Sequence, residues 1–274
     1  MKLSISNIGW EAAYNEQVYG LMKIYGFSGV EIAPTIWVSK NPYESEGVKK
    51  AKKIAVELKD KYGFTVPSMQ SILFGRQEKI FEAEEERNTL WNYMRQALDY
   101  ASAIGCKNLV FGCPRNRSIP DSLMSDVSET GRIEQKFFQT LGEYAAGVGT
   151  ILSMEANPPI YQTNYINSTP QAFQFVERMD SKGILLNLDV GTMIYNGEAA
   201  KLLEGKVNAI NHVHISEPGL KEIEKRPLHQ EVKSVLKDEG YDGFISIEVG
   251  KNNLGDKPIE SLERMMEYVV DIFA

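Results

Sequence analysis

Four residues that could bind a metal ion recur at nearly regular spacing through the second half of the chain. They are Glu155, Asp189, His214 and Glu248, and each comes near the end of a short apolar segment. Two carboxylates about 4 Å apart repel by roughly 4 kcal/mol at an effective dielectric constant of about 20, so three converging carboxylates need a cation. Oxygen ligands with one imidazole suit Mn²⁺, Mg²⁺, Co²⁺ or Zn²⁺. We therefore predict one divalent metal ion as cofactor, and the sequence leaves its identity open.

Polar residues also lie two positions before each of these four. Side chains alternate between the two faces of a strand, so this polar set points the same way as the predicted ligands. A single acid more often caps a helix or pairs with Lys or Arg. Four such residues in register at one end of consecutive strands favour a shared site. We expect the polar set to orient the metal ligands, and it consists of Ser153, Asn187, His212 and Ser246.

The elements that must position these residues follow a repeated alternation of short, β-branched apolar runs and longer segments with helical periodicity. Strands that alternate with helices pair in parallel through right-handed crossovers, and eight such units suggest closure into a barrel. No linker or change of composition divides the chain, so we predict an α/β fold, a single-domain (β/α)8 TIM barrel over residues 1–274. The predicted strands are Leu3–Asn7, Gly29–Ile32, Thr65–Met69, Asn108–Gly112, Thr150–Glu155, Ile184–Asp189, Ala209–His214 and Phe244–Glu248.

Composition limits the classes of partner. The formal net charge of −7 argues against nucleic acid, because binding to a phosphate backbone depends on clustered Lys and Arg. No apolar run is long enough to span a membrane and the first residues lack the apolar run of a signal peptide, so we expect a cytoplasmic protein with no membrane partner. The two cysteines, Cys106 and Cys113, are too few for a disulfide framework and are expected to be reduced.

Five further residues could contact a substrate, because they lie at strand ends or in the loops that follow. His229 follows the seventh strand and could bind substrate or exchange a proton, although a histidine at a helix start is as often a cap or a surface residue. Arg115 and Arg117 follow the fourth strand and could bind a phosphate or carboxylate in bidentate fashion, or belong to a solvated loop. Glu31 and Trp37 could line the pocket, Trp37 by stacking on a sugar ring, or could be packing residues.

A set of short segments, in order along nearly the whole chain, carries a family resemblance. The segments are Ser6-Asn7-Ile8-Gly9-Trp10, Gly29-Val30-Glu31-Ile32-Ala33-Pro34, Met154-Glu155-Ala156-Asn157-Pro158, Asn187-Leu188-Asp189-Val190-Gly191, His212-Val213-His214-Ile215-Ser216-Glu217 and Gly240-Tyr241-Asp242-Gly243-Phe244-Ile245-Ser246-Ile247-Glu248. Each is weakly specific by itself, but the ordered set is strongly specific. Together they resemble the xylose-isomerase-like TIM barrel superfamily, which contains sugar phosphate isomerases and epimerases and zinc-dependent AP endonucleases.

The resemblance implies a function. It implies that Glu155, Asp189, His214 and Glu248 bind the metal, and that the two glutamates also exchange protons with the substrate. A metal that chelates a carbonyl and the adjacent hydroxyl stabilises an enediolate, so we expect a metal-dependent isomerase or epimerase of a small sugar or sugar derivative. Homo-oligomerisation is likewise expected from the resemblance.

Other functions stay open on this scaffold. A dehydratase of a cyclic polyol or keto acid could form the same enolate and then lose a β-hydroxyl, and a non-catalytic sugar-binding barrel could keep the metal without turnover. Ketose 3-epimerases of the family carry a substrate-binding His where this chain has Thr192 and a second acid where it has Tyr161, which weighs against that activity. AP endonucleases need several more histidines for a three-metal cluster, and this chain has only 3 in total.

Overall fold

The strands form one parallel sheet that curves into a barrel. The computed structural model describes residues 1–274. Its sheet has the order β2-β1-β8-β7-β6-β5-β4-β3, and isolated bridges between Gly29 and Thr65 and between Ile32 and Met69 connect the two outer strands. The chain is therefore a nearly closed, single-domain (β/α)8 TIM barrel, as predicted. The strands are β1 (Lys2–Ser6), β2 (Gly29–Glu31), β3 (Ser68–Met69), β4 (Asn108–Phe111), β5 (Ile151–Glu155), β6 (Ile184–Asp189), β7 (Ile210–Ile215) and β8 (Phe244–Ile247).

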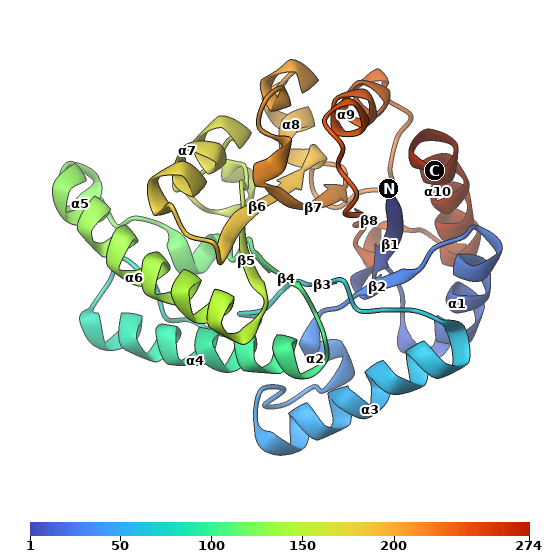
Figure 1. Ribbon diagram of the computed structural model, residues 1–274, viewed down its shortest axis with the longest axis horizontal. Helices are drawn as coiled ribbons and strands as arrows, with labels where there is room; N and C mark the ends of the chain where they lie inside the picture. Colours follow the sequence, from blue (N-terminus) through green and yellow to red (C-terminus); the bar gives the residue numbers. More distant parts are fainter.

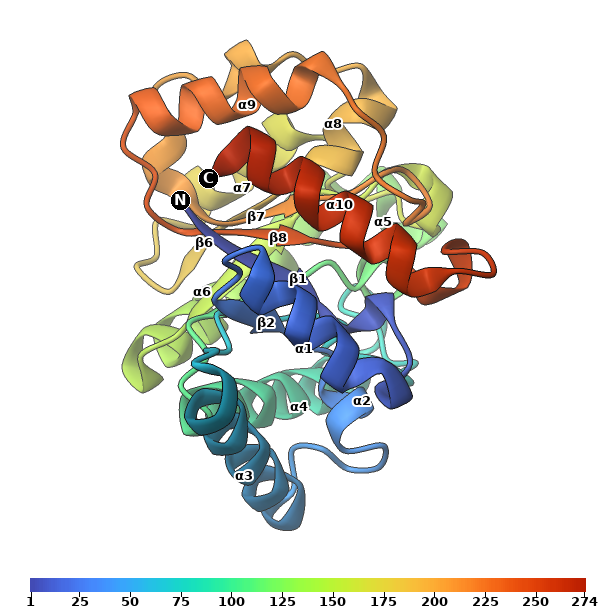
Figure 2. The ribbon, with the colours of Figure 1, turned by 90° about the vertical axis from the view of Figure 1, so that its right-hand side faces the viewer.

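Helices surround the strands as a ring, which is seen along the barrel in Figure 1. In Figure 2, α10 crosses the outside of the barrel, where it contacts β8, α1 and α9. The two chain termini lie side by side in both views. The helices are α1 (Asn15–Ile24), α2 (Pro34–Trp37), α3 (Ser45–Tyr62), α4 (Glu84–Ala103), α5 (Asp121–Met124), α6 (Val127–Val148), α7 (Thr169–Met179), α8 (Val190–Asn196), α9 (Pro227–Asp238) and α10 (Pro258–Phe273).

Local sequence explains where the elements begin and end. Helix α7 starts with a capping box, in which the Ser168 side chain accepts a hydrogen bond from Gln171 N and the Gln171 side chain bonds back to the Ser168 N–H. Helix α6 is followed by Gly149, whose φ of 78° continues the chain in the left-handed conformation that glycine adopts readily. The third strand is shorter than predicted because Pro67 has no N–H to donate to the sheet.

Alternation along the strands separates the core from the barrel interior. Leu152 and Met154 of β5 belong to the buried apolar cluster that the helices cover, whereas Glu155 of the same strand lines a cavity. The same arrangement holds for β6, where Leu186 and Leu188 are buried in the core and Asp189 lines the cavity. The period of two therefore carries the predicted ligands to the inside of the barrel.

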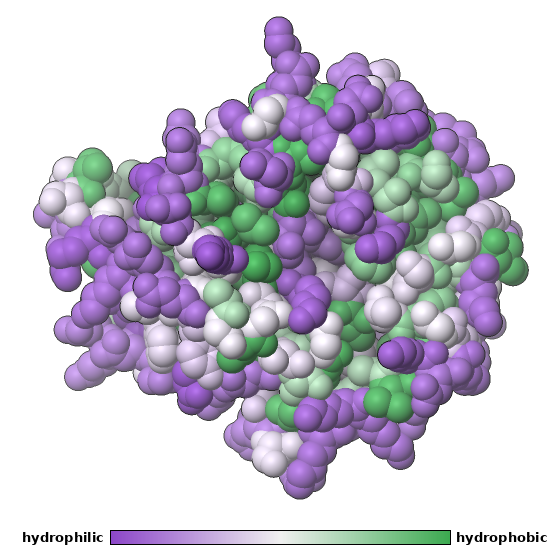
Figure 3. Space-filling model, viewed as in Figure 1, coloured by the Kyte–Doolittle hydropathy of each residue, from purple (hydrophilic) through white to green (hydrophobic).

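On the face shown in Figure 3, hydrophilic residues predominate around the rim, and apolar residues form patches nearer the centre. None of the helices combines the length and apolar character required to cross a bilayer.

Candidate active site

A cavity of about 930 Å³ opens at the C-terminal ends of the strands. Its floor contains the carboxylates of Glu155 and Asp189, the last residues of β5 and β6, and of Glu248, which directly follows β8. Most of its walls come from the loops that follow β3 and β4, and Tyr161 and Leu220 contribute to the rest. The C-terminal face is where barrels of this kind hold their active sites.

His214 on β7 lies between two of these carboxylates. Its Nδ1 is 3.0 Å from Glu155 Oε1 and 3.3 Å from Glu248 Oε2, and the imidazole is completely buried. The ligand atoms of these three residues all lie within 4.8 Å of one another. Strands β5, β7 and β8 thus bring together a compact set of one nitrogen and two carboxylate donors.

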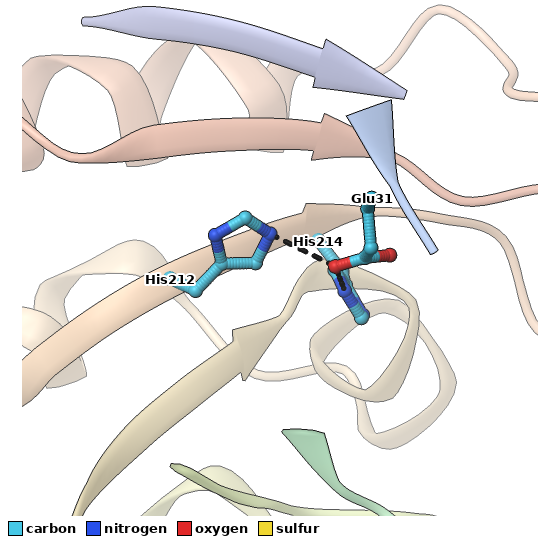
Figure 4. A group of neighbouring side chains, drawn as sticks. All are labelled: Glu31, His212 and His214. Carbon is cyan, nitrogen blue, oxygen red and sulfur yellow. Dashed lines mark hydrogen bonds and ion pairs between the residues drawn. The ribbon is translucent and has the colours of Figure 1, made fainter. Parts of the chain in front are cut away.

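Glu31 on β2 binds the other side of the same imidazole. The distance from His214 Nε2 to Glu31 Oε2 is 2.9 Å, and His212 Nε2 lies 3.1 Å from the same oxygen. Figure 4 shows the two imidazoles converging on this carboxylate. We expected Glu31 to line the pocket, but it is fully buried behind His214, because its place on β2 directs it into the barrel beneath the cavity floor.

The Glu31 contact sets the direction of the His214 ring. A proton on Nε2 that is donated to Glu31 leaves the Nδ1 lone pair facing Glu155 and Glu248. Burial by itself lowers the pKa of His214, but the adjacent Glu31 and Glu248 carboxylates raise that pKa well above its usual value. Burial opposes ionisation of Glu31, and the neighbouring His214 nevertheless holds the pKa of that carboxyl well below its ordinary value. The site therefore stabilises positive charge at the imidazole.

Asp189 is held beside this set and caps a helix. Its carboxylate accepts hydrogen bonds from Gly191 N at 3.2 Å and Thr192 N at 2.9 Å, the second and third residues of α8, and also from the Ser216 hydroxyl. Burial, together with the charges of Glu155 and Glu248, raises the pKa of Asp189 to about 7. Like charges crowded in this way favour a bound cation or a shared proton.

Of the four residues predicted to orient the ligands, two contact them directly or through one neighbour. Asn187 Nδ2 donates to Glu155 Oε1 at 2.7 Å and lies 3.2 Å from His214 Nδ1, and His212 reaches the site through Glu31. The other two serve elsewhere: Ser153 donates to Asn108 Oδ1, and the Ser246 hydroxyl is buried without a partner.

Two amides that the sequence analysis missed complete the surroundings of the glutamates. Gln70, just after β3, donates to Glu248 Oε1 at 2.8 Å, and Asn157, just after β5, donates to Glu155 Oε2 at 2.9 Å. Gln70 Nε2 also lies 3.1 Å from Glu31 Oε1. In the sequence, each amide appears only as a polar residue within two positions of a strand end. That position does not predict which carboxylate the side chain contacts.

Comparison with known proteins identifies the family of this barrel. The model of the xylose isomerase-like TIM barrel family matches residues 21–269. The chain belongs to this family. No curated protein matches the sequence.

Solved structures with the same fold include several epimerases. The 3-keto-D-glucoside 4-epimerase from E. coli superposes with a TM-score of 0.75 at 19% identity, over 98% of both chains. The D-psicose 3-epimerase from Clostridium cellulolyticum H10 gives a TM-score of 0.79 at 15% identity, over 99% of both chains. The IolI protein with a bound zinc atom gives a TM-score of 0.72 at 16% identity, over 100% of both chains. At these identities the likeness shows the fold of this xylose isomerase-like barrel.

Three other expected substrate contacts lie outside the cavity in this family member. Arg117 is completely buried, and its guanidinium donates to Glu155 O at 2.7 Å and to Asn157 Oδ1 at 3.0 Å, among other acceptors, so it does not reach a substrate. His229 is buried between α9 and α10 with its Nδ1 2.9 Å from the Tyr268 hydroxyl. Trp37, in α2, packs against the apolar core and does not line the cavity. Arg115 alone of the two arginines lines it.

Proposed function

We propose that this protein is a divalent-metal-dependent isomerase or epimerase of a small sugar or sugar derivative. The observation that carries the proposal is the buried imidazole nitrogen of His214, which faces the carboxylates of Glu155 and Glu248 at the floor of the cavity. The epimerases that share the fold, and the zinc named for the IolI protein, support the same conclusion.

The donor set fits a divalent ion. Nδ1 of His214 and one oxygen from each glutamate lie close together, and Asp189 adds a further carboxylate to the same cavity floor. We propose that these four residues hold the ion, and that hydrogen bonds to Glu31 and from Asn187, Asn157 and Gln70 orient them. When bound, such an ion polarises a carbonyl and the adjacent hydroxyl of a sugar and so acidifies the C–H between them.

The protein's own part is to hold and move protons. Glu155 and Glu248 come from β5 and β8, which are separated in the sheet by β6 and β7, so their carboxylates reach the cavity from different sides. One glutamate takes the proton from the substrate carbon and the other returns a proton to it. The face or carbon that receives this proton decides between epimerisation and isomerisation.

The first test is the metal content of the purified protein by elemental mass spectrometry, for the wild type and for Asp189→Ala and His214→Ala. We expect about one divalent ion per chain in the wild type and a large loss in both variants. A matched control, Asp121→Ala, changes an exposed acid of α5 that does not line the cavity, and leaves the content unchanged. Absence of metal after reloading the wild type would contradict the proposal and favour a sugar-binding barrel.

The second test is product analysis of the metal-loaded enzyme on a panel of ketoses and aldoses. In H₂O we expect a product of the same mass as the substrate. In D₂O we expect the product to have exchanged one carbon-bound hydrogen for deuterium. Glu155→Gln and Glu248→Gln should each remove turnover and exchange. A product lighter by one water would indicate the dehydratase instead.

A further inference from the structure

The cavity separates charge between its floor and one wall. The acids that line it are Glu155, Asp189 and Glu248, all at the strand ends. The cations that line it are Arg76, Lys79 and Arg115, all on the loops after β3 and β4. No acid lines that wall, so the wall presents net positive charge to a ligand whose reacting carbons lie over the carboxylates of the floor.

The two cationic loops are fastened to each other. Asn116, which is only 6% exposed, donates through Nδ2 to Arg76 O at 3.2 Å and to Glu78 O at 2.8 Å. The backbone N–H of Ile80 donates in turn to Asn116 O at 2.9 Å. Because these bonds cross between the loops, they hold the three cations on one wall of the cavity.

The cations differ in how far the protein neutralises them. Arg76 pairs with Glu78 and its guanidinium lies 4.7 Å from the centre of the Tyr93 ring, and Lys79 lies 3.9 Å from a Glu82 oxygen. Arg115 is exposed in the cavity wall, and its side chain makes no hydrogen bond or ion pair with the protein. Its planar set of donors is therefore free for a carboxylate or a phosphate.

We infer that this wall is a subsite for an anionic group of the substrate, and that Arg115 determines specificity for it. The inference rests on the proposed function and narrows its substrate class to sugars that carry a phosphate or a carboxylate away from the reacting carbons. Arg115 binds the anion directly, and Arg76 and Lys79 add to the local positive potential. The cavity volume of about 930 Å³ is near the upper end of the range for small-molecule sites and accommodates a sugar with such a substituent.

The test is binding measured by isothermal titration calorimetry with three probes: fructose, fructose 6-phosphate and glucuronate. The proteins compared are the wild type and the variants Arg115→Gln, Arg115→Lys and Lys182→Gln, all loaded with metal. The last variant removes one positive charge from an exposed residue just before β6, at the opposite end of the barrel. We expect at least one anionic probe to bind the wild type about tenfold or more tighter than fructose, as charge-assisted hydrogen bonds provide.

Arg115→Gln should remove the preference for the anionic probe without changing fructose binding. Arg115→Lys should retain part of this preference, and Lys182→Gln should retain all of it. The preference should also weaken as salt is raised. Tighter binding of fructose 6-phosphate identifies a phosphate as the anion, and tighter binding of glucuronate identifies a carboxylate. Failure of both anionic probes to bind more tightly than fructose, or a preference that survives Arg115→Gln, overturns the inference.

The outcomes separate the two proposals. Turnover of neutral sugars without any anion preference removes the subsite and leaves the proposed function. An anion preference that depends on Arg115, in a protein that turns over no sugar, keeps the subsite and removes the proposed function.

Discussion

Glu155 has room at the cavity floor because residue 112 is a glycine. A Cβ at this position would lie 2.7 Å from Glu155 Oε2 and 3.3 Å from Asn157 Oδ1, which belong to two hydrogen-bonded side chains. The nearest atoms belong to side chains, so the added methyl group displaces the carboxylate rather than the backbone. The position of one predicted ligand thus depends on the absence of a side chain just after the neighbouring strand β4.

Gly112→Ala should lower the affinity for Mn²⁺ and the turnover of substrate by about 10- to 100-fold, the usual effect of disturbing groups that orient metal ligands. Calorimetric titration of the metal-free protein with Mn²⁺ measures the affinity. The free energy of unfolding should fall by only about 1 kcal/mol, because a flexible side chain can move aside.

Gly147→Ala is the matched control, since a Cβ there meets nothing within 4 Å on the exposed side of α6. It should leave Mn²⁺ binding unchanged. Equal Mn²⁺ affinity in Gly112→Ala and the wild type would show that Glu155 does not bind the ion from the position described.

At the scale of elements, Arg117 joins the ends of β4 and β5. Its guanidinium lies within hydrogen-bonding distance of Phe111 O, Glu155 O, Asn157 Oδ1 and Ile166 O, at 2.7 to 3.3 Å. Burial lowers the pKa of Arg117 to about 10, so the side chain still carries its charge at neutral pH. The residue positions the backbone that presents Glu155.

Arg117→Met should lower the free energy of unfolding by about 3 kcal/mol, because it leaves several buried acceptors without a donor. Urea denaturation measures this difference. Arg132→Met, which breaks an exposed ion pair with Glu129, should cost less than about 1 kcal/mol. Equal losses in the two variants would contradict the central role of Arg117 in joining these strands.

His229 connects α9 to α10 through Tyr268 and predicts a pH dependence of stability. Burial, with a smaller effect of Arg226, lowers the pKa of His229 from 6.5 to about 4. Between these two values the unfolded chain binds a proton at this residue and the folded chain does not. Stability from this residue is therefore complete above pH 6.5 and is lost as the pH falls towards 4, by up to about 3 kcal/mol.

His229→Gln cannot titrate, so its free energy of unfolding should fall less than that of the wild type between pH 7 and pH 4. Urea denaturation at several pH values gives both curves, and their difference cancels the contributions of the other groups. Parallel curves would show that His229 titrates equally in the folded and unfolded chain.

For the whole molecule, the pairing of strands is least continuous between β2 and β3. Two isolated bridges, with backbone hydrogen bonds beside them, connect these strands, whereas each other pair of neighbours forms a ladder of consecutive pairs, with one register shift between β6 and β7. Gly29 lies at this junction, and a Cβ there would come within 2.7 Å of the Phe244 ring and 2.8 Å of Pro67. Both neighbours are rings with little freedom to move, so they cannot easily make room for the added methyl group.

Gly29→Ala should destabilise the protein by about 2 kcal/mol, the usual cost of overpacking, and should speed amide hydrogen exchange in β2 and β3 more than in β6. Gly20→Ala is the control, because a Cβ at that exposed position of α1 meets nothing within 4 Å and should stabilise the helix by about 0.5–1 kcal/mol. Uniform exchange changes across the strands would contradict a local weakness at this junction.

The fold and the carboxylates of the cavity floor could be predicted from the amino-acid sequence. Strand periodicity and eightfold alternation define the barrel, and inward-facing residues at the C-terminal ends of its parallel strands lie at or close beneath the cavity floor. Periodicity and position in the strand are therefore enough to bring Glu155, Asp189 and Glu248 together.

The contacts between side chains across the barrel became clear only in three dimensions. Gln70 reaches Glu248 from a distant strand, and Glu31 lies behind His214 rather than in the pocket. Arg115 and Arg117 are two residues apart, yet one lines the cavity and the other is buried under it. Such differences depend on the path of each loop and on the packing around it, which no periodicity in the sequence encodes.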